Sequence, residues 1–217
     1  MTHAALINVD FGAGGVYSGL AMYLGGSATD AWNGATAANI SQASALSLVD
    51  AAGQPTGVTM YYTGTTGIYS WNTPNTLLKD YLYTGNPIGN SFSVFLTGLD
   101  EGVYDLYVYC QADDGSTGRT TSFTAGGQSL TVGPTQNDFN AYIDGRNSGV
   151  LRGVTVGGDG LLTLTAANAC GTGVSNPRGV LNGFQLVVPE PTTALLLLTG
   201  VMALLAWPDS RLGRGRR

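Results

Sequence analysis

The stretch SFSVFLTGLDEGVYDLYVYC, residues 91–110, decides the fold class of this chain. Apolar and polar side chains alternate in SFSVFLTGL (91–99) and again in VYDLYVYC (103–110). A period of two places each set on one face of a β-strand. Between the two runs, LDEG (99–102) has the composition of a tight turn. The stretch therefore predicts two strands joined by a hairpin.

Similar runs along the chain predict an all-β domain. They are separated by Gly, Asp and Asn clusters, which are typical of turns. The predicted strands are 5–11, 57–62, 91–99, 103–110, 122–126, 128–132, 150–156, 161–166 and 180–188. Strands at this spacing favour a β-sandwich of the jelly-roll type over residues 1–187. One short helix is also expected, because Thr73-Pro74 can begin a helix and the apolar residues of 77–82 follow at helical spacing.

Composition limits the classes of function. Of 217 residues, 33 are glycine, roughly twice the usual share, and 11% are charged. Apart from its last residues the chain is acidic, which is unlike a nucleic-acid-binding surface, so we expect no nucleic-acid partner. His3 is the only histidine, which leaves a Ser–His–Asp or Cys–His mechanism without a base. No pair of facing carboxylates is evident for glycoside hydrolysis. We therefore expect a protein that is not an enzyme and has no cofactor.

Two small sets of residues leave alternatives open. Asp113 and Asp114 in QADDGSTG are candidate calcium ligands, although aspartates in glycine-rich loops are more often turn residues. Cys110 and Cys170 permit a single disulfide in an oxidising compartment. The alternative for the cysteines is two small buried apolar side chains.

Aromatic residues offer a candidate binding site. Trp32, Tyr61, Tyr62 and Trp71 lie in a stretch rich in Gly, Thr and Asn, where loops are expected. Flat rings beside asparagine side chains could stack on sugars while the amides bond sugar hydroxyls. The alternative is that these rings fill the core of the sandwich.

The composition changes abruptly after residue 187. Val188-Pro189-Glu190-Pro191 cannot continue a central strand, so the domain should end there. Thr192–Trp207 (TTALLLLTGVMALLAW) carries no charge and predicts an apolar helix of about 24 Å, shorter than a bilayer core of roughly 30 Å. A basic end follows, which should remain cytoplasmic and leave the body outside. Its members are Arg211, Arg214, Arg216 and Arg217.

The order of these three parts resembles the PEP-CTERM sorting signal of Gram-negative and related bacteria. That resemblance implies an exosortase as partner, followed by removal of residues 188–217 or their transfer to another anchor. An ordinary C-terminal anchor through residues 192–207 is the alternative. Either implies an exported protein of the cell envelope or extracellular surface. No signal peptide precedes ALINVDF (5–11), so we expect that the start is truncated or misassigned.

Three segments of the body resemble galactose-binding-like or malectin-like jelly rolls. They are INVDFG (7–12), FSVFLTGLDEGVYDLYVY (92–109) and VLNGFQLV (180–187). The resemblance implies that the last strand returns beside the first. The resulting hypothesis is a non-catalytic surface or matrix protein in contact with exopolysaccharide. The alternative is a secreted carbohydrate-binding module or carbohydrate-active enzyme.

Overall fold

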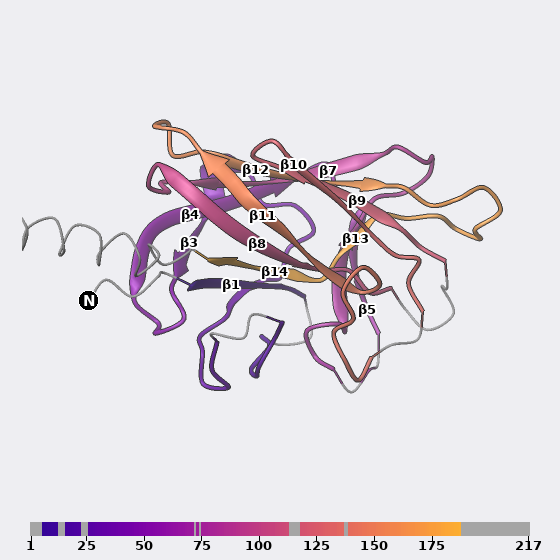
Figure 1. Ribbon diagram of the computed structural model, residues 1–217, viewed down its shortest axis with the longest axis horizontal. Coiled ribbons are helices and arrows are strands. Elements are labelled where there is room, and N and C mark those ends of the chain that lie inside the picture. Colours follow the sequence, from indigo (N-terminus) through magenta and orange to yellow (C-terminus); the bar gives the residue numbers. More distant parts are fainter. Residues whose placement is uncertain are drawn as a thin grey trace, which may run out of the picture.

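The computed structural model describes residues 6–12, 16–22, 26–71, 73, 75–112, 118–136 and 139–187. They form two large β-sheets that face each other and a small third sheet beside them (Figure 1). The five-stranded sheet contains, in spatial order, β11 (Ser148–Val156), β8 (Gly102–Tyr109), β14 (Gly183–Val187), β1 (Leu6–Phe11) and β2 (Asn33–Ala35).

The six-stranded sheet contains, in spatial order, β10 (Gln128–Val132), β9 (Thr121–Ala125), β12 (Leu162–Asn168), β7 (Ser91–Thr97), β4 (Pro55–Thr63) and β3 (Leu46–Val49). The small sheet consists of β13 (Val180–Leu181), β6 (Asp80–Tyr83) and β5 (Gly67–Ser70). In the part of the chain that is described, the single helical element is the 3₁₀ turn η1 (Gln42–Ser44).

The alternating runs seen in the sequence all form strands, which confirms the all-β prediction. The run at 180–188 divides at Asn182 into β13 and β14. Strand β14 pairs antiparallel with β1, from Leu6 opposite Val187 to Asp10 opposite Gly183. The last strand therefore returns beside the first, as the jelly-roll resemblance implied.

The core lies between the inner faces of the two large sheets. One side chain in two along each central strand points into it, as the alternation predicted. The five-stranded sheet contributes Ile7, Val9, Phe11, Tyr104, Leu106, Val108, Phe184 and Leu186. The six-stranded sheet contributes Val58, Met60, Tyr62, Phe92, Val94, Leu96, Phe123, Leu162, Leu164 and Ala166.

The predicted hairpin at residues 99–102 is wrong. Strand β7 pairs with β12 and β4, whereas β8 pairs with β11 and β14, so the turn carries the chain from one sheet to the other. The hydroxyl of Tyr104 donates to the carbonyl oxygen of Asp100 at 2.8 Å, like the tyrosine corners of other β-sandwiches. A short turn suits either connection. Two strands that lie in opposite sheets can both bury their apolar side chains in the core between the sheets without being hydrogen-bonded to each other.

The predicted helix after Thr73 is also wrong. Asn75 Oδ1 accepts a hydrogen bond from the Leu77 amide at 3.1 Å, and the Leu78 amide donates to the Asn75 carbonyl at 3.2 Å. These bonds close a turn, and the chain then continues as strand β6 rather than as a helix. Pairing of β6 with both β5 and β13 supplies backbone partners that a short isolated helix would lack.

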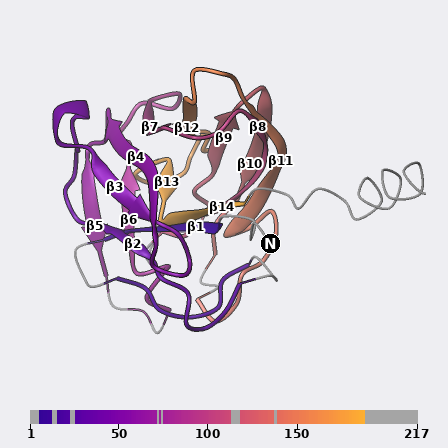
Figure 2. The same cartoon turned by 90° about the vertical axis from the view of Figure 1, so that its left-hand side faces the viewer.

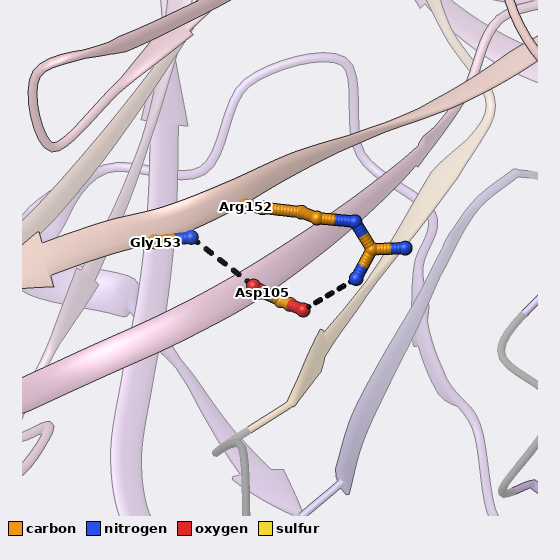
Figure 3. Close-up of polar contacts among 3 residues, drawn as sticks. All are labelled: Asp105, Arg152 and Gly153. Atoms are coloured by element: carbon orange, nitrogen blue, oxygen red, sulfur yellow. Dashed lines mark hydrogen bonds and ion pairs between the residues drawn. The ribbon is translucent and has the colours of Figure 1, made fainter.

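Strand β11 has a bulge between Leu151 and Val154, and the contacts that hold it lie on the outer side of the five-stranded sheet (Figure 3). Gly153 has a φ of +70°, and its amide donates to Asp105 Oδ1 at 3.1 Å. The Arg152 guanidinium donates to Asp105 Oδ2 at 2.9 Å, as Figure 3 shows. Because the Arg152 side chain is 66% exposed, this ion pair stabilises the fold by at most about 1 kcal/mol. The bond to the Gly153 amide is what fixes the extra residue in place.

Both cysteines are free and buried in the structure. Cys110 Sγ donates to Thr121 Oγ1 at 3.2 Å, and Cys170 Sγ contacts the Arg178 carbonyl oxygen at 3.5 Å. Burial raises the pKa of the Cys110 thiol to about 12, so this thiol is protonated at neutral pH. The structure corresponds to the alternative of two small buried side chains; it contains no bond between them.

The C-terminal motifs lie outside the described residues. These are the Val188–Pro191 box, the apolar segment 192–207 and the arginines from Arg211 to Arg217. The last strand, β14, ends at Val187. Within the ranges described, no helix is long and apolar enough to cross a membrane.

Candidate functional site

The outer face of the five-stranded sheet is covered by loops. Figures 1 and 2 show them, with the indigo N-terminal loops at the bottom of both views, below β1. An apolar cluster of Trp32, Leu77, Leu78 and Tyr109 joins these loops to the sheet. Leu77 lies over Gly183, where a Cβ atom would come within 2.9 Å of its Cδ1. The added Cβ would also lie 2.4 Å from the Val9 carbonyl oxygen, so glycine at this position leaves room for both the neighbouring strand β1 and the covering loop.

Polar side chains on the covered face hold the loops. Gln185 Nε2 donates to Asn8 Oδ1 at 2.9 Å, and the Tyr109 hydroxyl donates to Gln185 Oε1. The Tyr109 hydroxyl also accepts from the Met22 amide at 2.8 Å, and Asn8 Nδ2 donates to the Ala31 carbonyl at 3.0 Å. Asn8 and Gln185 are almost fully buried, so these bonds compensate for the water that both side chains lose.

Asp10 fixes the next loop. Its Oδ2 accepts a hydrogen bond from the Tyr17 amide at 2.8 Å, and the side chain is 1% exposed. Burial raises the pKa of Asp10 from 3.8 to about 7; the Tyr17 bond opposes this, and the charge of Asp80 adds to it. Asp80 lies against Gly12, where an added Cβ would be 2.3 Å from its Oδ2. The chain thus needs glycine at position 12 to pass the buried carboxylates.

Above this layer the loops form a hollow of about 330 Å³, which we call the loop pocket. The described residues of its lining carry rings, amides and hydroxyls, and none of them is charged. The lining residues are Tyr17, Ser18, Asn75, Thr76, Phe139 and Asn140. They come from three segments that are far apart in the sequence.

Ring contacts hold the lining of the loop pocket in place. Tyr17 stands edge-on against Trp32, with ring centroids 4.9 Å apart, and Phe139 packs against Trp71 at 4.4 Å. The Tyr142 hydroxyl donates to the Tyr17 hydroxyl at 3.3 Å. Because the rings are supported from behind, little side-chain freedom remains to be lost on binding.

This arrangement is suited to a neutral sugar. Aromatic faces accept the apolar C–H side of a sugar ring, while amide and hydroxyl groups can both donate and accept hydrogen bonds to its hydroxyls. Among the lining residues that the structure describes, a charged ligand would find no opposite charge. The buried carboxylates Asp10 and Asp80 lie beneath and do not line it.

The predicted stacking residues do not form one site. Tyr62 is fully buried in the core and Trp32 is 8% exposed, so the prediction of open stacking faces is wrong for both. Trp71 supports the loop pocket from behind, through Phe139. Tyr61 lies on the six-stranded sheet, stacked on Phe95 with centroids 4.6 Å apart.

Sequence reasoning missed most of the lining of the loop pocket. Asn75, one of the asparagines in the Gly-, Thr- and Asn-rich stretch that contains the predicted rings, does line it. Tyr17, Ser18, Phe139 and Asn140 were not predicted. A signal was present in NDFNAY (137–142), where rings alternate with Asn in a segment that lacks the strand pattern.

The metal prediction is not tested by the structure. Asp113 and Asp114 lie outside the described residues. Among the residues that are described, no three His, Cys, Asp or Glu side chains gather closely enough to hold a metal ion.

No protein-family model and no curated protein matches the chain. Several solved structures are similar. A family 35 carbohydrate-binding module from an environmental isolate is 11% identical, over 59% of this chain and 87% of that one, with a TM-score of 0.42. TmCBM61 in complex with β-1,4-galactotriose is 15% identical, over 58% and 86%, with a TM-score of 0.34. The ANX2 ectodomain from Arabidopsis thaliana is 10% identical, over 86% and 50%, with a TM-score of 0.45. At these values no ligand or residue role is carried over to this chain.

Proposed function

We propose that residues 6–187 form a non-catalytic carbohydrate-binding module whose loop pocket takes a neutral sugar unit. The observation that carries this proposal is the composition of the pocket. Two aromatic rings, two amides and two aliphatic hydroxyls meet there, none of these described residues is charged, and the rings are held by Trp32 and Trp71. Carbohydrate-binding modules among the similar structures agree with the proposal but do not carry it.

Titration calorimetry with neutral oligosaccharides of glucose, galactose, mannose and xylose tests this proposal, with oligogalacturonate as the charged comparison. We expect one neutral class to bind and Phe139→Ala to weaken it about tenfold or more, because a stacking face is lost. Tyr69→Ala is the matched control, since Tyr69 is an exposed ring on β5 that does not line the pocket. Equal binding by Phe139→Ala and the unaltered chain would refute the loop pocket as the site.

The C-terminal segment suggests where the module acts. We infer that residues 188–217 are a PEP-CTERM sorting tail, read by an exosortase, which places the module on the cell envelope facing exopolysaccharide. The Val188–Pro191 box, the apolar run and the terminal arginines support this inference. Intact mass of the protein recovered from its native envelope is the test. A loss of mass corresponding to cleavage near the box should disappear in a Pro189→Ala/Pro191→Ala variant; an unprocessed chain in both cases contradicts sorting.

A further inference from the structure

The outer face of the six-stranded sheet is uncovered. The outward residues of β7 and β12 are exposed or half-buried, whereas the core residues that alternate with them are buried. On β10, β9, β12, β7 and β4, the outward residues alternate with the core residues, and each is Ser, Thr, Ala, Gly, Pro, Phe or Tyr. We call this surface the hydroxyl face. None of its outward side chains on these five strands is charged.

Hydroxyl groups form a row across all five strands. Strand pairing places them opposite one another, so that neighbours are about 4.8 Å apart and the row spans roughly 19 Å. The members of the row are Ser129, Thr124, Thr165, Ser93 and Thr63. Ser93 and Thr165 are hydrogen-bonded at 3.0 Å. One hydroxyl of such a pair still has a proton to donate, and both keep acceptor capacity, so the row can bond an outside ligand.

A shallow groove of about 420 Å³ includes one end of this row, since Ser129, Thr124 and Thr165 line it. Thr163 and Thr165 lie in its floor, and the β9–β10 turn forms one side. On the neighbouring strand β7, Phe95 lies directly opposite Thr163, outside the groove lining, and is stacked on Tyr61 in near-parallel orientation. The groove therefore has a floor of threonine side chains, and a stacked aromatic pair lies next to it on the same sheet.

The β9–β10 turn is built to stay in place. Gly126 and Gly127 have φ angles of +49° and +82°, as a tight two-residue hairpin requires. The Gly126 carbonyl accepts from the Thr155 hydroxyl at 3.1 Å, and an added Cβ at Gly126 would be 2.7 Å from the Thr155 backbone. The wall of the groove is thus pressed against β11 and preformed.

The composition of the hydroxyl face favours one class of binding partner over others. Protein interfaces favour aromatic residues, Met and Arg and are depleted in serine. Apart from Phe95 and Tyr61, the outward residues of the hydroxyl face are small or carry hydroxyls, and none is Met or Arg. Nucleic acids require basic side chains to neutralise phosphates, and the outward residues include none. A neutral polysaccharide matches on each count, because it is uncharged, long and covered with hydroxyls, and its sugar rings have apolar faces that suit Phe95 and Tyr61.

We propose that the hydroxyl face is a second binding surface, separate from the loop pocket, for an extended uncharged polysaccharide chain. The chain lies in the groove against Thr163 and Thr165 and crosses the hydroxyl row. The two surfaces belong to opposite sheets, so one molecule can hold a single sugar unit and a polymer at the same time. Binding through both sites at once increases the overall affinity for a polysaccharide network, because the second binding event takes place within an already bound molecule.

Affinity electrophoresis of the full-length chain in soluble glucan, galactan, mannan and xylan tests the second surface. Polygalacturonate serves as the charged comparison. We expect retardation by one neutral polymer, and about a tenfold weaker effect for Thr124→Val/Thr165→Val, which keeps shape and removes two hydroxyls. Thr172→Val, an exposed threonine outside this face, is the control. Thermal unfolding of each variant verifies that the sheet is intact.

The outcomes separate the two sites. Binding at the hydroxyl face predicts that Thr124→Val/Thr165→Val leaves oligosaccharide binding at the loop pocket unchanged, and that Phe139→Ala retains part of the polymer binding. The proposal is overturned if no neutral polymer retards the chain, or if polymer binding is unaffected by the threonine variant. It is also overturned if Phe139→Ala alone abolishes polymer binding. Self-association of the chain that the threonine variant removes, seen by sedimentation, would assign the face to a second copy instead.

Discussion

The two outer faces of the sandwich differ in how their polar side chains are satisfied. On the five-stranded sheet, Asn8, Asp10 and Gln185 lie under loops and bond to one another, to Tyr109 and to loop backbone. On the six-stranded sheet, Ser and Thr stand open and bond in cross-strand pairs, as Thr59 does with Thr97 at 2.8 Å.

This difference shows what a strand's outward residues can build. Long amides and carboxylates reach beyond the sheet and hold a second layer, which here carries the loop pocket. Short hydroxyls reach only their neighbours, so they leave a flat face that water or a ligand must complete. Both faces belong to strands with the same alternating pattern, and only the type of outward residue separates them.

The largest expected contrast is in pH dependence. Because the pKa of Asp10 is raised from 3.8 to about 7 on folding, the folded chain binds a proton that the unfolded chain releases between these values. The stability from protonated Asp10 is therefore present below about pH 4 and lost as the pH rises to about 7. Relative to Asp10→Asn, the unaltered chain should lose up to about 4 kcal/mol over this window.

Urea unfolding of both proteins at pH 4 and pH 8 measures the Asp10 effect. Asp100→Asn, at an exposed carboxylate in the turn after β7, is the control. If the stability difference between the unaltered chain and Asp10→Asn were the same at both pH values, ionisation of the buried Asp10 would not contribute to the pH dependence of stability.

Close packing under the covered face gives the next effect. Gly12→Ala places a Cβ 2.3 Å from Asp80 Oδ2, and we expect about 3 kcal/mol of destabilisation from overpacking. Gly171→Ala is the control, because no atom lies within 4 Å of its added Cβ. Thermal unfolding of the two variants decides; equal melting temperatures would mean that the Gly12 segment moves away freely.

A matched pair of polar-to-apolar substitutions gives the smallest effects. Gln185→Leu leaves Tyr109 and Asn8 without one buried partner each and should cost about 2 kcal/mol. Thr163→Val on the open face should change stability by less than about 0.5 kcal/mol, since valine suits a strand equally well. Denaturant midpoints measure both variants. Similar losses of stability at Gln185 and Thr163 would contradict the proposed difference between the two faces.

The sequence predicted the strands better than their connections. Alternation is a local property, so β1, β4, β7, β8 and β12 could be placed within two residues. The short turn at 99–102 predicts a hairpin, because the sequence of a short loop does not indicate which sheet receives the next strand. The helix after Thr73 was expected from spacing alone, but β5 and β13 offer the segment hydrogen-bond partners that only the folded chain brings near.

The candidate site was harder to predict than the fold. The sequence drew attention to rings near asparagines, and Asn75 does line the loop pocket. It could not separate Tyr62, which fills the core, from Tyr61, which lies outside, until the register of β4 was known. Tyr17 and Phe139 lie more than a hundred positions apart and meet only because their loops cover the same sheet.

By itself, the sequence determined the all-β class, the inward apolar sets of the central strands and the acidic character of the body, because alternation and charge are properties of each segment alone. Tertiary structure decided which strands became neighbours, which outward face was covered, and which rings and amides met. Those outcomes depend on pairing between segments that are distant in the sequence. Which segment supplies a hydrogen-bond partner or covers a face is decided only when the whole chain has folded.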